Sequence, residues 1–217
     1  MATPLPMAMF PLQSALLPDE DLPMQIFEPR YTALIRDCMR DDDPRFGVVL
    51  ISHGREVGGG DVRCDVGTVA RITDCVDLAG SGRFVLRCQT GERIRVCDWL
   101  PDDPYPRAMV QAWPDEPGEP VTARQLEELE DRVMALFERI ADARGVPLPD
   151  RVTLLGGDKA GPDFTAGQRL FALAARIPIG TADQYTVLSA PSAADRLAAL
   201  SEAVDAVAEL VEFQLSE

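Results

Sequence analysis

The chain contains one histidine, His53, and one lysine, Lys159, so few catalytic sets can be built from it. A serine or cysteine hydrolase needs a histidine base beside its nucleophile, and no G-x-S-x-G motif accompanies His53, which we interpret as an exposed loop residue. Lys159 lies in GGDKAGP, which lacks the spacing of a phosphate-binding loop and has Ala160 where such a loop carries a hydroxyl. We therefore predict neither nucleotide hydrolysis nor serine–lysine chemistry, and assign no catalytic residue.

Cysteines are few and poorly spaced for metal binding. They are odd in number and no two form a C-x-x-C pair, which is typical of buried free thiols in a reducing compartment rather than of a disulfide frame or a zinc site. Acidic clusters at residues 41–43 and 102–103 lack the alternating acids and turn glycine of a calcium loop. We predict no metal and no cofactor. The five cysteines are Cys38, Cys64, Cys75, Cys88 and Cys97.

The sequence also lacks a long apolar run and a positively charged leader, so we predict a cytoplasmic protein that does not enter membranes. Acidic residues number 36 and basic residues 21, which gives a formal net charge of −15. A division near Asp115 leaves 12 basic and 18 acidic residues before it and 9 and 18 after it. Both halves are acidic, so nucleic acid is a poor partner for either of them.

The first half of the chain has the pattern of short strands with one helix. Apolar residues recur at helical spacing from Pro29 to Met39, and a proline suits the first helical turn. Glycine-rich turns at 58–60 and 80–82 separate apolar or alternating runs, and Thr90-Gly91 is expected to close a hairpin. These features predict a small antiparallel barrel or sandwich. The expected strands cover 46–52, 66–78, 84–89, 93–99 and 107–113.

The composition changes at residues 114–120, PDEPGEP, which we interpret as a stiff linker between a domain of residues 1–115 and one of 121–217. Beyond it the apolar period becomes helical. Four helix-start signals pair a Ser or Thr with a Gln or Asp three residues later, in the manner of a capping box. They begin at Thr122, Thr165, Thr181 and Ser192, and amphipathic helices of this kind predict a bundle.

Several segments, in this order, resemble the amino-terminal substrate-binding domain of the Lon protease. FPLQSALLPDEDLPMQIFEPRY at 10–31 is similar to the opening of that domain, in which two strands lead into F-E-P-R-Y and a helix. Further matches are FGVVLI at 46–51, EVGG at 56–59, DVGTVARI at 65–72, GRFVLRCQTGERIRV at 82–96 and YPRAMV at 105–110. The helical half is a looser match, in which Arg196 and Leu197 open the final helix, and residues 145–163 do not align.

The resemblance implies an α+β fold, a PUA-like antiparallel pseudo-β-barrel with one helix followed by an α-helical bundle. It also implies a role in holding unfolded or partly folded polypeptides. In full-length Lon a P-loop ATPase and a serine–lysine protease follow this domain, and neither is found in this sequence, so we expect a non-catalytic adaptor of protein quality control or proteolysis. A homodimer is left open. The alternatives are an RNA-binding module, as for other PUA-like barrels, and a hydrolase built around His53 or an acid pair.

A polypeptide-binding surface needs exposed, adaptable apolar groups, and three residues are our candidates for it. Met24 has a flexible thioether, and Trp99 and Tyr105 flank the loop at 100–104 with rings that carry a polar handle. Ile26, Phe27 and Met39 are expected in the core because of their places on a strand and a helix stripe. Glu28 and Arg30 are expected to form an ion pair or cap at the start of the helix.

Overall fold

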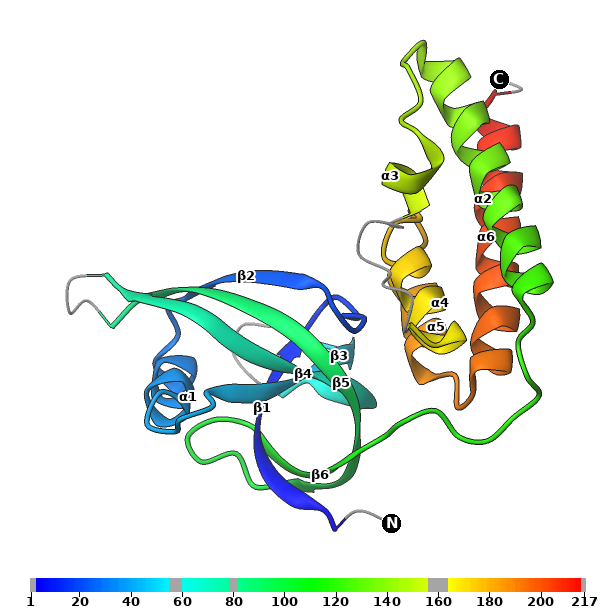
Figure 1. The fold of residues 1–217 in the computed structure, drawn as a ribbon. Coiled ribbons are helices and arrows are strands. Elements are labelled where there is room, and N and C mark those ends of the chain that lie inside the picture. The colour runs from blue at the N-terminus through cyan, green and yellow to red at the C-terminus, as the bar shows by residue number, and fades with distance from the viewer. Residues whose placement is uncertain (1–2, 55–59, 79–81, 156–163, 216–217) are drawn as a thin grey trace. The chain divides into compact units, whose positions relative to one another are not determined.

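The computed structural model describes residues 3–54, 60–78, 82–155 and 164–215, in two compact units, 1–114 and 115–217. The predicted glycine loop at 58–59, the turn at 80–81, the EVGG match and Lys159 lie outside the described residues. Among its described residues the first unit, here the sheet unit, contains six strands and one helix, whose arrangement Figure 1 shows. They are β1 (Leu5–Leu12), β2 (Asp21–Ile26), α1 (Pro29–Cys38), β3 (Arg45–His53), β4 (Val62–Asp77), β5 (Phe84–Leu100) and β6 (Arg107–Ala112).

The six strands form one sheet in the order β2-β5-β4-β3-β1-β6, and β5 also pairs with β6. The pairings β5-β4-β3-β1-β6 therefore return to β5, while β2 pairs with β5 outside this ring. All pairs are antiparallel except β1 with β3, which is parallel. The predicted α+β pseudo-barrel with one helix is confirmed, with this one parallel pair as a departure from an antiparallel sheet.

The predicted hairpin at Thr90-Gly91 is wrong, because β5 runs through it as one strand of 17 residues. Its first part pairs with β2 and its last part with β6, while the register against β4 shifts between the pairs Thr68–Arg93 and Ala70–Thr90. The glycine thus marks a bulge, which bends a strand and changes its partners without ending it. Between β4 and β5 the Leu78 N–H donates to the Arg83 carbonyl at 2.9 Å.

Two apolar clusters fill the sheet unit. The larger one packs α1 against β1, β2, β3 and the first part of β5, and contains a stacked pair of rings, Phe10 and Tyr31, with centroids 3.9 Å apart. The smaller one joins β1 to β6 and the second part of β5 around Met9 and Ile94. Both clusters bury alternate residues of their strands, as a two-faced sheet requires.

The second unit, here the helical unit, contains α2 (Ala123–Arg144), α3 (Arg151–Leu155), α4 (Ala166–Ala174), α5 (Thr181–Ser189) and α6 (Ala193–Leu215). Full capping boxes at Thr122 and Thr165 are confirmed, and the Ser192 hydroxyl accepts the Asp195 N–H at the start of α6. The expected cap at Thr181 is wrong, because Gly180 is the N-cap and Thr181 is the first helical residue. Extended φ and ψ at Gly180 allow the chain to enter α5 without a side-chain cap.

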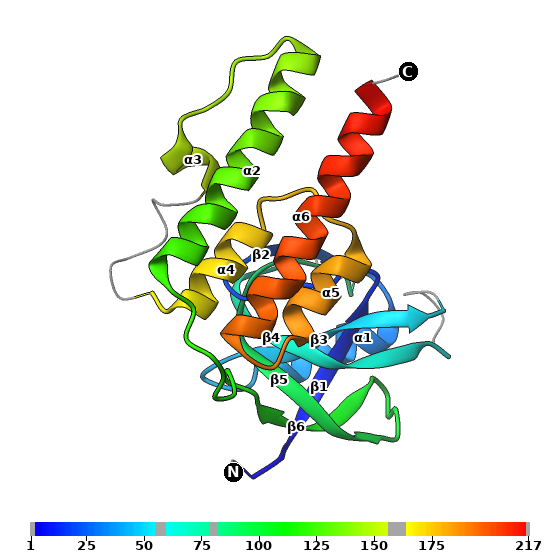
Figure 2. The ribbon, with the colours of Figure 1, turned by 90° about the vertical axis from the view of Figure 1, so that its right-hand side faces the viewer.

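Within the helical unit α6 packs against α2, α4 and α5, and α2 and α6 run side by side (Figure 2). Arg196, at the start of α6, is fully buried and donates both terminal nitrogens to the Asp115 carboxylate, at 2.6 and 3.0 Å. Its guanidinium lies 3.6 Å from the Phe171 ring centroid. No helix in the described ranges is long and apolar enough to cross a membrane.

Candidate functional site

An apolar groove of about 210 Å³ runs along β2 in the sheet unit. Five consecutive residues of β2, from Leu22 to Ile26, line it, together with side chains from β1 and α1. The remaining lining residues are Phe10, Leu12, Phe27, Glu28 and Tyr31. Hydrocarbon and aromatic atoms at the surface of a concave site are the usual lining of a binding pocket, so this groove is the candidate site.

The stacked rings of Phe10 and Tyr31 both line the groove. Burial raises the pKa of the Tyr31 phenol to about 12, and the nearby Arg30 guanidinium opposes this rise. The Arg30 guanidinium also lies 4.4 Å from the Tyr31 ring centroid, in the geometry of a cation–π contact. The phenol therefore stays neutral at physiological pH, and the two rings bring no charge of their own to the groove.

Phe27 is the most exposed apolar residue of the groove, and its predicted burial is wrong. Phe27 is 59% exposed, whereas Met24 and Ile26 on the same segment are buried. The alternation of a strand explains this, because residues 24 and 26 face the core and residues 25 and 27 face away from it. Met39 is also exposed, contrary to prediction, since it is the C-cap after the last turn of α1.

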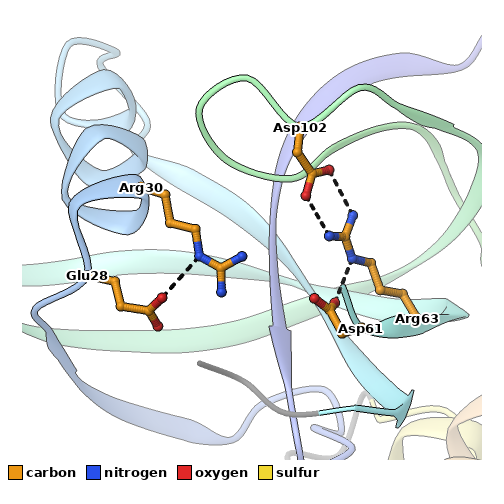
Figure 3. A network of polar contacts seen from close by, with 5 residues as sticks. All are labelled: Glu28, Arg30, Asp61, Arg63 and Asp102. Carbon is orange, nitrogen blue, oxygen red and sulfur yellow. Dashed lines mark hydrogen bonds and ion pairs between the residues drawn. The ribbon is translucent and has the colours of Figure 1, made fainter. Parts of the chain in front are cut away.

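Two ion clusters lie in the region shown in Figure 3. The Glu28 carboxylate pairs with Arg30 at 3.2 Å, which confirms the expected pair at the start of α1. The Arg63 guanidinium bonds Asp61 at 2.7 Å and, through two parallel hydrogen bonds, Asp102 of the β5–β6 loop at 2.7 and 3.0 Å. Burial lowers the pKa of Arg63, but the two carboxylates together raise it by more. The guanidinium therefore stays charged and bonded to both of them.

The three predicted binding residues do not share one pocket. Met24 is buried and lines the groove. Tyr105 is buried in the same apolar cluster and donates its hydroxyl to the Asp37 carboxylate at 2.9 Å. Trp99 is half-buried, packs on the smaller cluster, and has the Arg63 guanidinium 4.8 Å from its ring centroid. A surface formed by all three stays a prediction, and only Met24 adjoins the groove.

Sequence reasoning missed the groove itself, and one signal was available. Pro23 stands in the middle of β2, and a proline within a strand is typical of a sheet edge. The Arg63 cluster had no such signal, because Asp102 lies 39 positions along the chain from Arg63. His53 is exposed at the end of β3, as predicted, and no three-residue cluster of potential metal ligands occurs in the described part of the chain.

A mixed six-stranded sheet with one helix, followed in the chain by a set of helices, defines an α+β protein with a surface groove in its sheet unit. The family model of the ATP-dependent protease La (LON) substrate-binding domain matches residues 6–206, and the chain belongs to this family. The family identifies it as a substrate-binding module.

Solved structures agree with this fold. A Lon N-terminal domain protein from Xanthomonas campestris is 24% identical, with a TM-score of 0.63, over 90% of this chain and 96% of that one. The N-terminal domain of Mycobacterium avium complex Lon protease is 14% identical, with a TM-score of 0.62, over 93% and 98% of the two chains. The comparison with curated proteins gave no match.

Proposed function

We propose that the chain is a non-catalytic module that holds unfolded or partly folded polypeptides in the cytoplasm, as an adaptor of protein quality control or proteolysis. One observation carries the proposal: a member of a substrate-binding domain family has an apolar groove beside an exposed phenylalanine. Five free cysteines are consistent with a reducing compartment.

The groove has the properties that recognition of many sequences requires. Its lining is mostly hydrocarbon from Leu12, Leu22, Met24 and Phe27, so it gains affinity from apolar side chains of any shape. The Met24 thioether can adjust to irregular partners. A folded protein buries most of its large apolar side chains, whereas an unfolded one presents them. The groove therefore favours unfolded segments over folded surfaces.

The net charge of the chain further restricts the class of partner that it can bind. The chain carries a net charge of −15, and three arginines of the sheet unit, Arg30, Arg40 and Arg63, each pair with a carboxylate. Cations that already serve a carboxylate contribute little to phosphate binding, so RNA is disfavoured. Segments with basic residues next to apolar ones are favoured by the same field.

A fluorescence-anisotropy titration tests the proposal. The purified chain is titrated against a labelled, permanently unfolded polypeptide, with the folded form of that polypeptide and a labelled RNA as controls. We expect saturable binding to the unfolded form alone. Equal binding to the folded form, or tighter binding to RNA, would contradict the proposed function.

A pair of variants assigns the binding to the groove. Phe27→Ser removes the exposed ring at the groove, and it should weaken binding roughly tenfold, the effect of losing about 1.5 kcal/mol of apolar burial. Leu5→Ser is the matched control, because Leu5 is similarly exposed, 63% against 59%, lies in the same unit and does not line the groove. Equal affinities of the two variants would place the binding surface elsewhere.

A further inference from the structure

Strand β2 forms an edge of the sheet. It stands at one end of the sheet order, and all six of its residues pair with β5. Among the described residues no strand pairs with its other side. An edge strand presents backbone N–H and C=O groups that can accept a further strand, and proteins usually block such edges.

The register identifies the backbone groups that face outward. The Thr90 N–H donates to the Glu20 carbonyl at 2.9 Å, just before the ladder begins. Hydrogen-bonded and non-hydrogen-bonded pairs alternate along an antiparallel ladder, so Leu22, Met24 and Ile26 direct their backbone groups to β5. The backbone groups of Asp21, Pro23 and Gln25 then face the free edge.

Pro23 agrees with this assignment, because it has no N–H and would break the ladder at a position facing β5. At the free edge it offers its carbonyl but no donor. Gln25, two residues further on, offers both an N–H and a carbonyl in the middle of the exposed groove wall, and its side chain is exposed. The edge is thus half-blocked, with Gln25 as its main open position.

The groove lies on this free side of β2. Residues 22–26 line it without a break, which places the strand's edge in its wall, and none of the described residues lining it belongs to β5. Leu12 of β1 and the stacked rings of Phe10 and Tyr31 also line it. A ligand in the groove therefore meets both the backbone groups of β2 and apolar side chains.

We propose that a bound polypeptide adds to the outer edge of β2 as an extra strand, with its backbone bonded to Gln25 and with alternate apolar side chains in the groove. This inference rests on the proposed function and names its mode and its ligand class. Backbone pairing accepts any sequence except proline at bonded positions, and side-chain pockets at every second residue select apolar groups. The ligand is an extended segment whose apolar residues alternate with polar or basic ones.

The occupant is an unfolded segment rather than a second copy of this chain. Two copies would meet edge to edge with a charge of −15 each, and Asp21 lies at the end of each edge. Basic residues on the ligand's outward face instead complement Asp21 and the acidic chain as a whole. The missing donor at Pro23 interrupts a long ladder between copies more than it interrupts a contact centred on Gln25.

Protein variants test the pairing by changing the backbone donors at the free edge of β2. The probe is a labelled ten-residue peptide in which valine alternates with lysine. Gln25→Pro removes the outward N–H and should weaken its binding at least fivefold relative to Gln25→Ala, which keeps the N–H and loses the same side chain. Pro23→Ala adds a donor at the edge and should strengthen binding severalfold. Circular dichroism and the unfolding midpoint check that each variant folds.

The parent protein provides a second test that requires no variant. Two peptides of the same sequence are N-methylated, one at every odd residue and the other at every even residue, so each loses the donors of one strand edge. Strand addition predicts that one loses binding and the other keeps it. Equal binding of the two peptides, or of the two Gln25 variants, would overturn strand addition and leave groove binding through Phe27 intact.

The remaining outcomes are also decisive. Failure of the parent to bind either the peptide or the unfolded polypeptide would refute the proposed function, and strand addition with it. Sedimentation that shows a concentration-dependent dimer, dissociated by Gln25→Pro, would assign the edge to a second copy and overturn the proposal. A monomer that binds only one of the two methylated peptides supports it.

Discussion

The sheet unit and the helical unit complete their backbone hydrogen bonding in different ways. In the helical unit the starts of α2 and α4 have capping boxes, and α2 ends at Gly145 in the left-handed conformation, with its N–H bonded back into the helix. In the sheet unit the edge of β2 stays open beside an apolar groove. Since main-chain recognition needs unused donors and acceptors, this difference supports the binding role proposed for the sheet unit.

The two units can be followed separately in one experiment. Both tryptophans, Trp99 and Trp113, lie in the sheet unit, so tryptophan fluorescence reports on it alone. Four of the five long helices, with α1 as the exception, lie in the helical unit and dominate the far-ultraviolet circular dichroism. A change that acts on one unit should shift one signal and leave the other in place.

The largest effect is expected from Gly67→Ala in β4. A Cβ at this position would lie 2.0 Å from the Val48 carbonyl oxygen, a backbone atom of the paired strand β3 that can move only if the strand itself shifts. We expect the sheet unit to lose at least about 3 kcal/mol of unfolding free energy, measured by fluorescence in urea.

Gly91→Ala is the matched control for Gly67→Ala. The nearest atom to its new Cβ is the Val69 carbonyl oxygen at 3.9 Å, an ordinary contact distance. Its unfolding midpoint should stay close to that of the parent. A similar loss in both variants would show that strand propensity, and not the close approach at Gly67, sets the cost.

Arg196→Met should act on the helical unit. Arg196 is fully buried, whereas the Asp115 side chain to which it donates two hydrogen bonds is 34% exposed. Removal of one partner of a buried pair costs about 3–5 kcal/mol, and the partial exposure of Asp115 lowers this to about 2–3 kcal/mol. The dichroism transition should shift and the fluorescence transition should not.

Arg124→Met is the surface control for the buried pair. Arg124 and Glu128 are both exposed, and solvent screens such pairs, so they contribute little to stability. A loss for Arg196→Met as small as that of Arg124→Met would contradict a stabilising role for the buried pair.

Alkaline pH is expected to have the next largest effect, because it should destabilise the sheet unit more than the helical unit. Burial raises the pKa of the Cys38 and Cys88 thiols from 9.0 to about 12, and all five cysteines lie in the sheet unit. Between about pH 9 and pH 12 the unfolded chain releases thiol protons that the folded chain retains, so stability is full below pH 9 and is lost as pH rises. The fluorescence midpoint in urea should fall across this range more steeply than the dichroism midpoint. Parallel decline of the two signals would contradict this origin.

Much of the fold could be predicted from the sequence, because local patterns determine it. The apolar spacing from Pro29 to Cys38 gives α1, and Thr122 and Thr165 fix the starts of α2 and α4 through bonds three residues apart. The predicted hairpin at Thr90-Gly91 is wrong because a glycine at a bulge and a glycine at a turn have the same local sequence pattern. Only pairing with β2, β4 and β6, which are distant in sequence, shows that β5 continues.

The candidate site was less predictable, because exposure depends on the tertiary neighbours of a residue. Met24 and Phe27 are both apolar residues near the end of β2, yet one is buried and the other is exposed. Because they are an odd number of residues apart, they lie on opposite faces of the strand. Which of them is buried follows only once the face that meets α1 is known. Tyr105 and Trp99 are candidates because of their ring chemistry, which the sequence shows. Their surroundings depend on residues far away in the chain, since Tyr105 bonds to Asp37 and Trp99 contacts Arg63.

The smallest effect is expected at the helix caps, where it tests how completely the helical unit satisfies its backbone. Thr165→Ala removes the hydroxyl that accepts the Gln168 N–H at the start of α4, and it should lower the dichroism-monitored stability by about 1 kcal/mol. Thr181→Ala is the matched control, because Thr181 lies inside α5 and Gly180 is the N-cap. The two sites look equivalent as sequence, since each Thr is followed three residues later by Gln. An equal loss at both would mean that Thr181 caps α5 in solution, and an unchanged Thr165→Ala would mean that packing of α4 on α6 alone determines where α4 begins.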